Sequence, residues 1–194
     1  DISNTRTMTK IEVRPVRTKQ DRQIFLTFPW TIYHDDPLWI PPLLPERARM
    51  IDPARGTILK RGKGEFFIAW RGTDPVGTIC AAVDPPTNQN RGKKACIFGF
   101  FDYIQDYAVF RALIEAAADW GRTYGLNALF GPFNLDYEDS YSVLVEGRSR
   151  PPAMMCGHTP PYYLDFMQKC GFEEARAQNV AMGADLADTP QIQR

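Results

Sequence analysis

The sequence has little of what marks membrane spans or nucleic-acid-binding surfaces. No apolar stretch approaches the roughly 18 residues that a membrane-spanning helix needs, and the N-terminus has no apolar signal segment. The 23 basic and 23 acidic residues balance to a formal net charge of zero, so the whole chain is not attracted to nucleic acid or to an acidic membrane. We therefore expect a soluble, cytoplasmic protein without a nucleic-acid or membrane partner.

Cysteine and histidine are too few and too scattered to indicate a metal site or a disulfide framework. The 4 cysteines include no C-x-x-C pair, and the 2 histidines form no cluster with them. Most of the cysteines lie in apolar runs or beside a predicted helix end. We interpret them as reduced, buried thiols, and we expect no metal.

The remaining composition is typical of one well-buried globular domain. The chain has 194 residues, 44% of them hydrophobic, without an internal repeat or a change of composition. We expect a single domain over residues 10–183, with residues 1–9 disordered or foreign to the natural sequence and a polar tail over 184–194. An alternative is that the chain is a fragment of a longer protein.

The strongest local pattern is an apolar run that leads into a long amphipathic helix. Residues 95–101 (A-C-I-F-G-F-F) are typical of an interior strand. Apolar residues then recur at helical spacing over residues 107–124, between Asp106 as N-cap and Gly125 as a stop. The free N–H groups of the helix N-terminus suit a phosphate or pyrophosphate, and we expect the largest pocket where they face the strand end.

The other periodic segments alternate between strands and helices. A polar loop is predicted over residues 84–93 and a long loop over 135–161. The expected strands are 10–17, 65–70, 76–83, 129–133 and 177–182, and the expected helices are 19–33 (split at Pro29), 45–51 and 162–170 (ended by Gly171). This order predicts a mixed α/β domain with a twisted central sheet flanked by helices.

Three irregular segments each have two interpretations. Residues 34–44, extended by their prolines, are either a structural strap or one wall of a substrate channel. The basic loop with Lys60, Arg61 and Lys63 either reaches a phosphate or is simply solvated. The loop over 135–161 is long enough to be functional, and Glu138 in it is either a site residue or a solvated one.

Three short motifs resemble the GNAT superfamily of acyl-CoA N-acyltransferases, and more closely an uncharacterised bacterial branch of it. The motifs are Pro75-Val76-Gly77, Phe98-Gly99-Phe100-Phe101, and Pro160-Pro161-Tyr162-Tyr163 followed by Gly171-Phe172. With the order of elements, the resemblance covers residues 11–182. It implies a GNAT-like sheet on which an amine attacks the thioester of a bound acyl-CoA directly.

The resemblance also implies where the site residues lie. Asp102 is a candidate base, with capping of the long helix as its alternative, and Glu138 is a further catalytic candidate. Met167 stands where the family often has a tyrosine acid, so Tyr162 and Tyr163 are the substitutes. The co-substrate is acetyl-CoA or a longer acyl-CoA, the acceptor is a small-molecule amine, and the residues expected to contact the co-substrate are Phe100, Phe101, Tyr103, Ile104, Gln105 and Asn134.

The glycine-rich pyrophosphate loop of that family has no counterpart here. The corresponding residues 102–107 (D-Y-I-Q-D-Y) contain two carboxylates and no glycine, and negative charge beside a pyrophosphate is unfavourable. Catalysis is therefore one of three interpretations, beside a non-catalytic module that binds a small molecule or an acyl chain and a structural half of a larger enzyme. The resemblance implies two strands after the last helix, and only one is expected here. Either the chain is a fragment with a missing second domain, or a partner such as a second copy in a homodimer completes the sheet edge.

Overall fold

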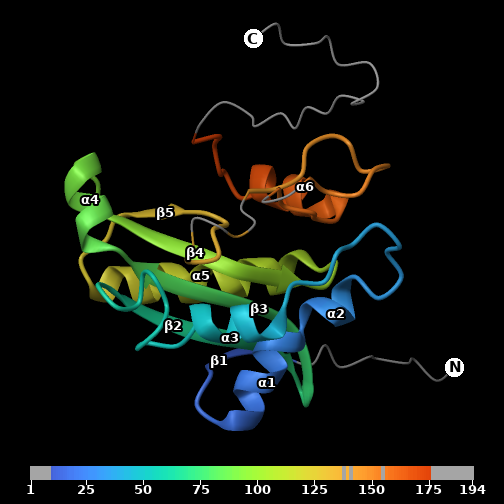
Figure 1. Ribbon diagram of the computed structural model, residues 1–194, viewed down its shortest axis with the longest axis horizontal. Helices are drawn as coiled ribbons and strands as arrows, with labels where there is room; N and C mark the ends of the chain where they lie inside the picture. Colours follow the sequence, from blue (N-terminus) through green and yellow to red (C-terminus); the bar gives the residue numbers. More distant parts are fainter. Residues whose placement is uncertain (1–9, 137–138, 140–141, 154–155, 176–194) are drawn as a thin grey trace, which may run out of the picture.

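The computed structural model describes residues 10–136, 139, 142–153 and 156–175, and these form a five-stranded sheet with helices on both faces (Figure 1). The strands follow one another across the sheet in chain order: β1 (Ile11–Pro15), β2 (Lys63–Arg71), β3 (Asp74–Val83), β4 (Ala95–Tyr103) and β5 (Ala128–Phe130). Neighbours from β1 to β4 pair antiparallel, whereas β4 and β5 pair parallel. The predicted mixed α/β class is confirmed.

Two hydrophobic cores occupy the two faces of the sheet. On one face α5 (Tyr107–Thr123) and α6 (Pro161–Lys169) pack against β4 through Phe98, Phe101 and Tyr103. On the other face α1 (Lys19–Thr27) and α3 (Leu44–Met50) pack against side chains such as Ile68 and Phe100. Because Phe100 and Phe101 face opposite cores, β4 contributes to both.

The helix boundaries follow the capping and proline signals of the sequence. The Asp106 side chain accepts a hydrogen bond from the N–H of Ala108 at the start of α5, and Gly125 beyond its end has a φ of 68°. Thr18 and Asp21 form a capping box on α1, and Pro29 begins a separate short helix, α2 (Pro29–Ile32). No helix among the described residues has both the length and the apolar character that a bilayer span requires.

Two predicted segments were wrong in part. The loop expected over residues 84–93 contains α4 (Pro85–Arg91), because two prolines suit a first helical turn and Gly92, at a φ of 57°, suits a helix end. β5 ends at Phe130 rather than at Phe133. The strand expected over residues 177–182 and both chain ends lie outside the described residues.

A bulge at Phe100 separates β4 from β5. Phe100 has a φ of 46°, and the pairing of β3 with β4 shifts register between Thr78 and Cys80. The Thr78 hydroxyl donates to the Phe100 carbonyl (2.9 Å), and the Phe100 N–H donates to Oδ1 of Asn134 (2.7 Å). Pairing of β4 with β5 stops at Ile97, so the last residues of β4 form an edge that side chains and loops complete.

We predict that Gly99→Ala weakens this junction far more than an ordinary alanine substitution in the sheet. A Cβ at Gly99 would lie 1.9 Å from the Phe133 carbonyl oxygen, and the backbone there must move. The loss should be about 3 kcal/mol in the free energy of unfolding, measured by urea denaturation. Gly64→Ala is the matched control, because its nearest neighbour, 2.7 Å away, is the flexible end of Leu59. Equal losses in the two variants would contradict the tight junction.

Candidate functional site

Asp102, near the end of β4, is where three distant parts of the chain meet. Its Oδ1 lies 3.3 Å from the hydroxyl of Tyr33, just after α2, and 3.4 Å from the hydroxyl of Tyr163 in α6. The Tyr33 hydroxyl also lies 3.1 Å from the carbonyl oxygen of His158, so its one proton serves either acceptor. Protein surrounds Asp102 on most sides, yet the residue keeps some exposure. Two tyrosine hydroxyls thus lie within hydrogen-bond distance of a largely enclosed carboxylate.

The positive charge of Arg47, in α3, acts electrostatically on this carboxylate. The residue is only 4% exposed, and its guanidinium lies over the ring of Phe100 at 4.7 Å. Neither its Nε nor its Nη2 has a hydrogen-bond partner among the described residues. Together with Tyr33, Asp102, His158 and Tyr163, Arg47 forms what we call the Asp102 cluster.

Burial raises the pKa values of the carboxyl and of both tyrosine hydroxyls in the Asp102 cluster. Burial raises the pKa of Asp102, and the charge of Arg47 opposes that rise without cancelling it. Burial also raises the pKa values of Tyr33 and Tyr163 well above their usual range. The tyrosines are therefore proton donors at neutral pH, and Asp102 is a stronger base than an exposed aspartate.

The two tyrosines at the start of α6 complete the free edge of β4. The Tyr162 hydroxyl donates to the Tyr103 carbonyl (2.6 Å), and the Tyr103 N–H donates to the Tyr163 hydroxyl (3.0 Å). The ring of Tyr103 stacks on that of Tyr163 at 4.2 Å, and both Tyr103 and Phe101 are buried. The side chains of Phe101 and Tyr103 are thus core residues, and both backbone polar groups of Tyr103 are bonded to hydroxyls of α6.

The N-terminus of α5 differs from the expected open phosphate site. Asp106 caps the helix and pairs with Nη2 of Arg71 (2.5 Å), so the cap is Asp106 and not Asp102. Ile104 and Gln105 form the turn between β4 and the helix, and aromatic rings from α5 and α6 pack beside it. The predicted large pocket is not among the two clearest pockets of the described residues.

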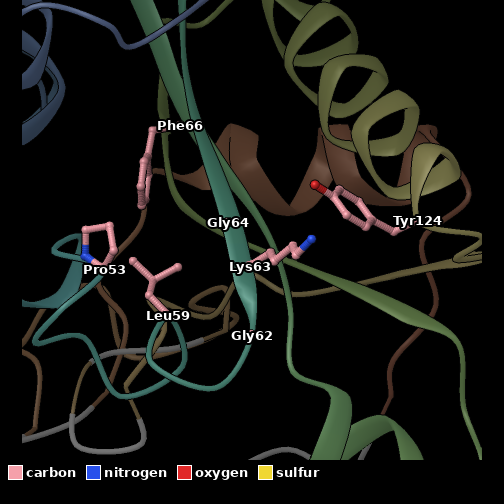
Figure 2. Close-up of a pocket in the computed structure, with 7 residues that line it drawn as sticks. All are labelled: Pro53, Leu59, Gly62, Lys63, Gly64, Phe66 and Tyr124. Carbon is pink, nitrogen blue, oxygen red and sulfur yellow. The ribbon is translucent and has the colours of Figure 1, made fainter.

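Those two pockets lie toward the opposite end of the sheet. The first has a volume of about 270 Å³, and Figure 2 shows Lys63 and Tyr124 on one side of β2 with Phe66 on the other. Lys63 begins β2, and Tyr124 follows the C-terminal end of α5, where the helix dipole is negative. The second pocket lies along α5 beside Trp120 and Arg17. Neither pocket reaches the Asp102 cluster.

The basic loop before β2 is partly committed to the fold. The guanidinium of Arg61 donates two hydrogen bonds of 2.8 Å to the buried carboxylate of Asp84. The ammonium of Lys63 lies 5.3 Å from the ring centre of Tyr124. The positive charges of Arg61 and Lys63 thus have partners within the fold. The suggested contact of this loop with a phosphate remains a prediction.

The extended segment after α2 joins the Asp102 cluster through two side chains. The ring of Trp39 stacks on Tyr33 at 5.0 Å, and Oδ2 of Asp36 lies 2.6 Å from Nε2 of His158. Ile40 and Leu43 remain 60% and 72% exposed. The segment therefore packs down only in part.

Of the residues predicted for the site, the structure brings Asp102, Tyr162 and Tyr163 together. Phe100 and Asn134 form the neighbouring bulge, and Glu138 lies outside the described residues. Sequence reasoning missed Tyr33, Arg47 and His158 as members of the Asp102 cluster. One signal for Arg47 was present: it lies three residues from both Leu44 and Met50, on the apolar side of a helix, where an arginine is rarely found.

Comparison with known proteins finds curated relatives of about twice this length. The chain is 32% identical over 183 residues to the bacterial ceramide synthase of Caulobacter vibrioides, covering 94% of this chain and 48% of that protein. It is 33% identical over 165 residues to protein YghO of Escherichia coli, covering 84% and 41%. The chain thus spans about half the length of the curated relatives it matches. No family model matches it.

Several solved structures share the arrangement of strands and helices. One is a tandem GNAT protein from the clavulanic acid biosynthesis pathway, with a TM-score of 0.53 and 16% identity, covering 84% of this chain and 43% of that one. Another is AAC(6')-Iy in complex with a CoA bisubstrate analogue, with a TM-score of 0.50 and 12% identity over 91% and 99% of the two chains. An aminoglycoside acetyltransferase from a soil metagenome, bound to sisomicin, also has a TM-score of 0.50, with 16% identity over 91% and 95%. This chain has the fold of the GNAT superfamily of acetyltransferases.

Proposed function

We propose that this chain carries the site of an N-acyltransferase that moves a fatty acyl group from acyl-CoA to the amine of a long-chain lipid. The observation that carries the proposal is the Asp102 cluster, a carboxylate with two tyrosine hydroxyls at the point where β4 leaves β5. The similarity to a protein named a ceramide synthase supports the lipid class, because a ceramide is the amide of a fatty acid and a long-chain amine.

In the proposed reaction the amine attacks the thioester carbonyl carbon directly. Asp102 accepts the proton that the amine nitrogen loses as the C–N bond forms. When the C–S bond breaks, the hydroxyl of Tyr163 donates a proton to the leaving thiolate and takes one back through Asp102, to which it is hydrogen bonded. The raised pKa of Asp102 suits a base. The raised pKa of Tyr163 keeps its hydroxyl protonated, but makes it a weaker acid. No covalent enzyme intermediate is required.

The ion pair of Arg71 with Asp106 bears on the binding of the co-substrate. A carboxylate at the N-terminus of α5 repels a pyrophosphate, but Arg71 offsets the charge of Asp106 at 2.5 Å. The positive end of the α5 dipole can therefore still attract a pyrophosphate, because the neighbouring Arg71–Asp106 pair has no net charge. This supports acyl-CoA as the donor despite the missing glycines.

A second candidate function is a non-catalytic module that binds an acyl chain or a small molecule. The observation that favours it is the packing at the end of β4, where the hydroxyls of Tyr162 and Tyr163 occupy the backbone groups of Tyr103. The role of a structural half of a larger enzyme, with a homodimer or a second domain as partner, is a third proposal. It is compatible with the length of the relatives.

We predict that the purified chain transfers an acyl group from a long-chain acyl-CoA to a long-chain amine, followed by mass spectrometry of the amide. Asp102→Asn should lower kcat by roughly 100-fold or more, because the base is lost while acyl-CoA binding is kept. Asp119→Asn is the matched control, because that carboxylate is exposed on α5 and pairs with Arg122 there. Equal activity in the Asp102 and Asp119 variants would contradict the assignment. Acyl-CoA binding without transfer would favour the binding module.

The raised pKa of Asp102 also predicts how stability depends on pH. Above the ordinary aspartate value of 3.8, the folded chain keeps a proton that the unfolded chain has lost. Wild-type stability relative to Asp102→Asn should therefore fall as pH rises from 3.8 through the raised pKa, and then stay constant. Urea titrations of both proteins across this pH range measure the difference. A stability difference that stays constant from pH 3.8 upward would contradict a raised pKa of Asp102, and would mean that Arg47 offsets the effect of burial.

A further inference from the structure

The side chain of His158 joins the segment before α6 to the segment after α2. The two segments lie side by side (Figure 1), and Nε2 of His158 lies 2.6 Å from Oδ2 of Asp36. The other carboxylate oxygen of Asp36 accepts from the N–H of Leu38 (2.9 Å). The hydrogen bond from His158 lowers the pKa of Asp36, so this carboxylate is ionised at neutral pH and only accepts. The proton on Nε2 therefore serves the bond to Asp36, which we call the latch.

The backbone of His158 makes a second contact with the segment after α2. The His158 carbonyl oxygen lies 3.1 Å from the hydroxyl of Tyr33, and the His158 side chain is only 8% exposed. Because Tyr33 and Asp36 are three residues apart, residue 158 is attached to one short stretch of chain at two points. The latch thus restricts how far the carbonyl can move away from the Tyr33 hydroxyl.

The Tyr33 hydroxyl lies between two acceptors. One is the His158 carbonyl, and the other is Oδ1 of Asp102 at 3.3 Å. The ring of Tyr33 is held by the stacked ring of Trp39 at 5.0 Å. A hydroxyl has one proton and two lone pairs, so a proton given to the carbonyl leaves a lone pair that accepts. The hydroxyl is therefore able to donate to an ionised Asp102 or to accept from a protonated one.

We propose that His158 is a positioning residue whose carbonyl lets the Tyr33 hydroxyl stabilise both protonation states of Asp102. The inference rests on the proposed function, in which Asp102 takes a proton from the amine and passes it on through Tyr163. While Asp102 is ionised, Tyr33 donates to it. When Asp102 has gained the proton, it donates to the Tyr33 oxygen, and the proton of Tyr33 turns to the His158 carbonyl. A buried acid without such an acceptor is costly to form, so the latch helps the base to take its proton.

The direct test is the pKa of Asp102, followed by the NMR chemical shift of its carboxyl carbon in the isotope-labelled chain and assigned with Asp102→Asn. Asp36→Ala removes the latch. Without it the ionised Asp102 keeps Tyr33 as a donor, but the protonated form loses its acceptor, so the pKa of Asp102 should fall. A latch that only pressed Tyr33 against Asp102 would give the opposite sign, because loss of a donor raises the pKa of a carboxyl.

The matched control is Asp35→Ala, next to the latch in sequence. Asp35 pairs with His34 at 2.8 Å, and both side chains are exposed, so this is the same pair of residue types without burial. Its loss should leave the pKa of Asp102 unchanged. Arg47 and Tyr163, which also act on that pKa, are the same in both variants.

If Asp36→Ala does not fold by circular dichroism, His158→Leu replaces it. That variant removes the same side-chain bond, keeps the backbone carbonyl, and places an apolar side chain at a largely buried position. The pKa of Asp102 should fall in this variant for the same reason.

A double-mutant cycle in acyl transfer tests whether the latch acts through Tyr33. Asp36→Ala and Tyr33→Phe should each lower kcat on the order of tenfold and leave the KM for acyl-CoA unchanged. The double variant should be no slower than Tyr33→Phe alone, because the latch then has no hydroxyl to serve.

Three results would overturn the inference. They are a pKa of Asp102 that rises or stays the same without the latch, an equal fall in Asp35→Ala, and losses of kcat that multiply in the double variant. The NMR titration needs no turnover. A fall in the pKa of Asp102 in a chain that transfers no acyl group would therefore refute the proposed function and leave the positioning of Tyr33 by His158 standing.

Discussion

The hydrogen bonds that hold Phe100 at a positive φ determine where β4 and β5 separate. Thr78 fixes its carbonyl from β3, and Asn134 fixes its N–H from the segment after β5. An L-residue adopts this conformation only where its surroundings enforce it. Everything in the candidate site follows from this point, since the bulge turns Phe100 toward Arg47 and leaves the last residues of β4 to be completed by α6.

The electrostatics of the site depend on that separation. Asp102 follows the bulge by two residues, where β4 still pairs with β3 but no longer with β5, and its carboxylate meets the hydroxyls of Tyr33 and Tyr163. Burial disfavours its charge more than Arg47 favours it, so the pKa of Asp102 is raised and the carboxylate is a stronger base than an exposed one. The same burial keeps Tyr33 and Tyr163 protonated. The separation of β4 from β5 thereby places a proton acceptor, Asp102, beside two proton donors, Tyr33 and Tyr163.

Local patterns predicted the fold well and long-range contacts poorly. Asp106, Pro29 and the apolar run of β4 act on their own neighbours, so their effects could be predicted from the sequence. Asp102 and Tyr163 were predicted as site residues through the family resemblance. Tyr33, however, is 69 residues from Asp102 in sequence, and no local rule links them. The coverage of the β4 edge by tyrosine hydroxyls depends equally on how α6 docks, which is why an open pocket was expected there.

The measurement that tests this account most directly is a crystal structure of the chain with a non-transferable acyl-CoA analogue. The account predicts the reacting carbon beside Asp102 and Tyr163, with the pyrophosphate near the N-terminus of α5 and Arg71. An analogue bound instead in the pocket of Lys63 and Tyr124, at the other end of the sheet, would contradict it.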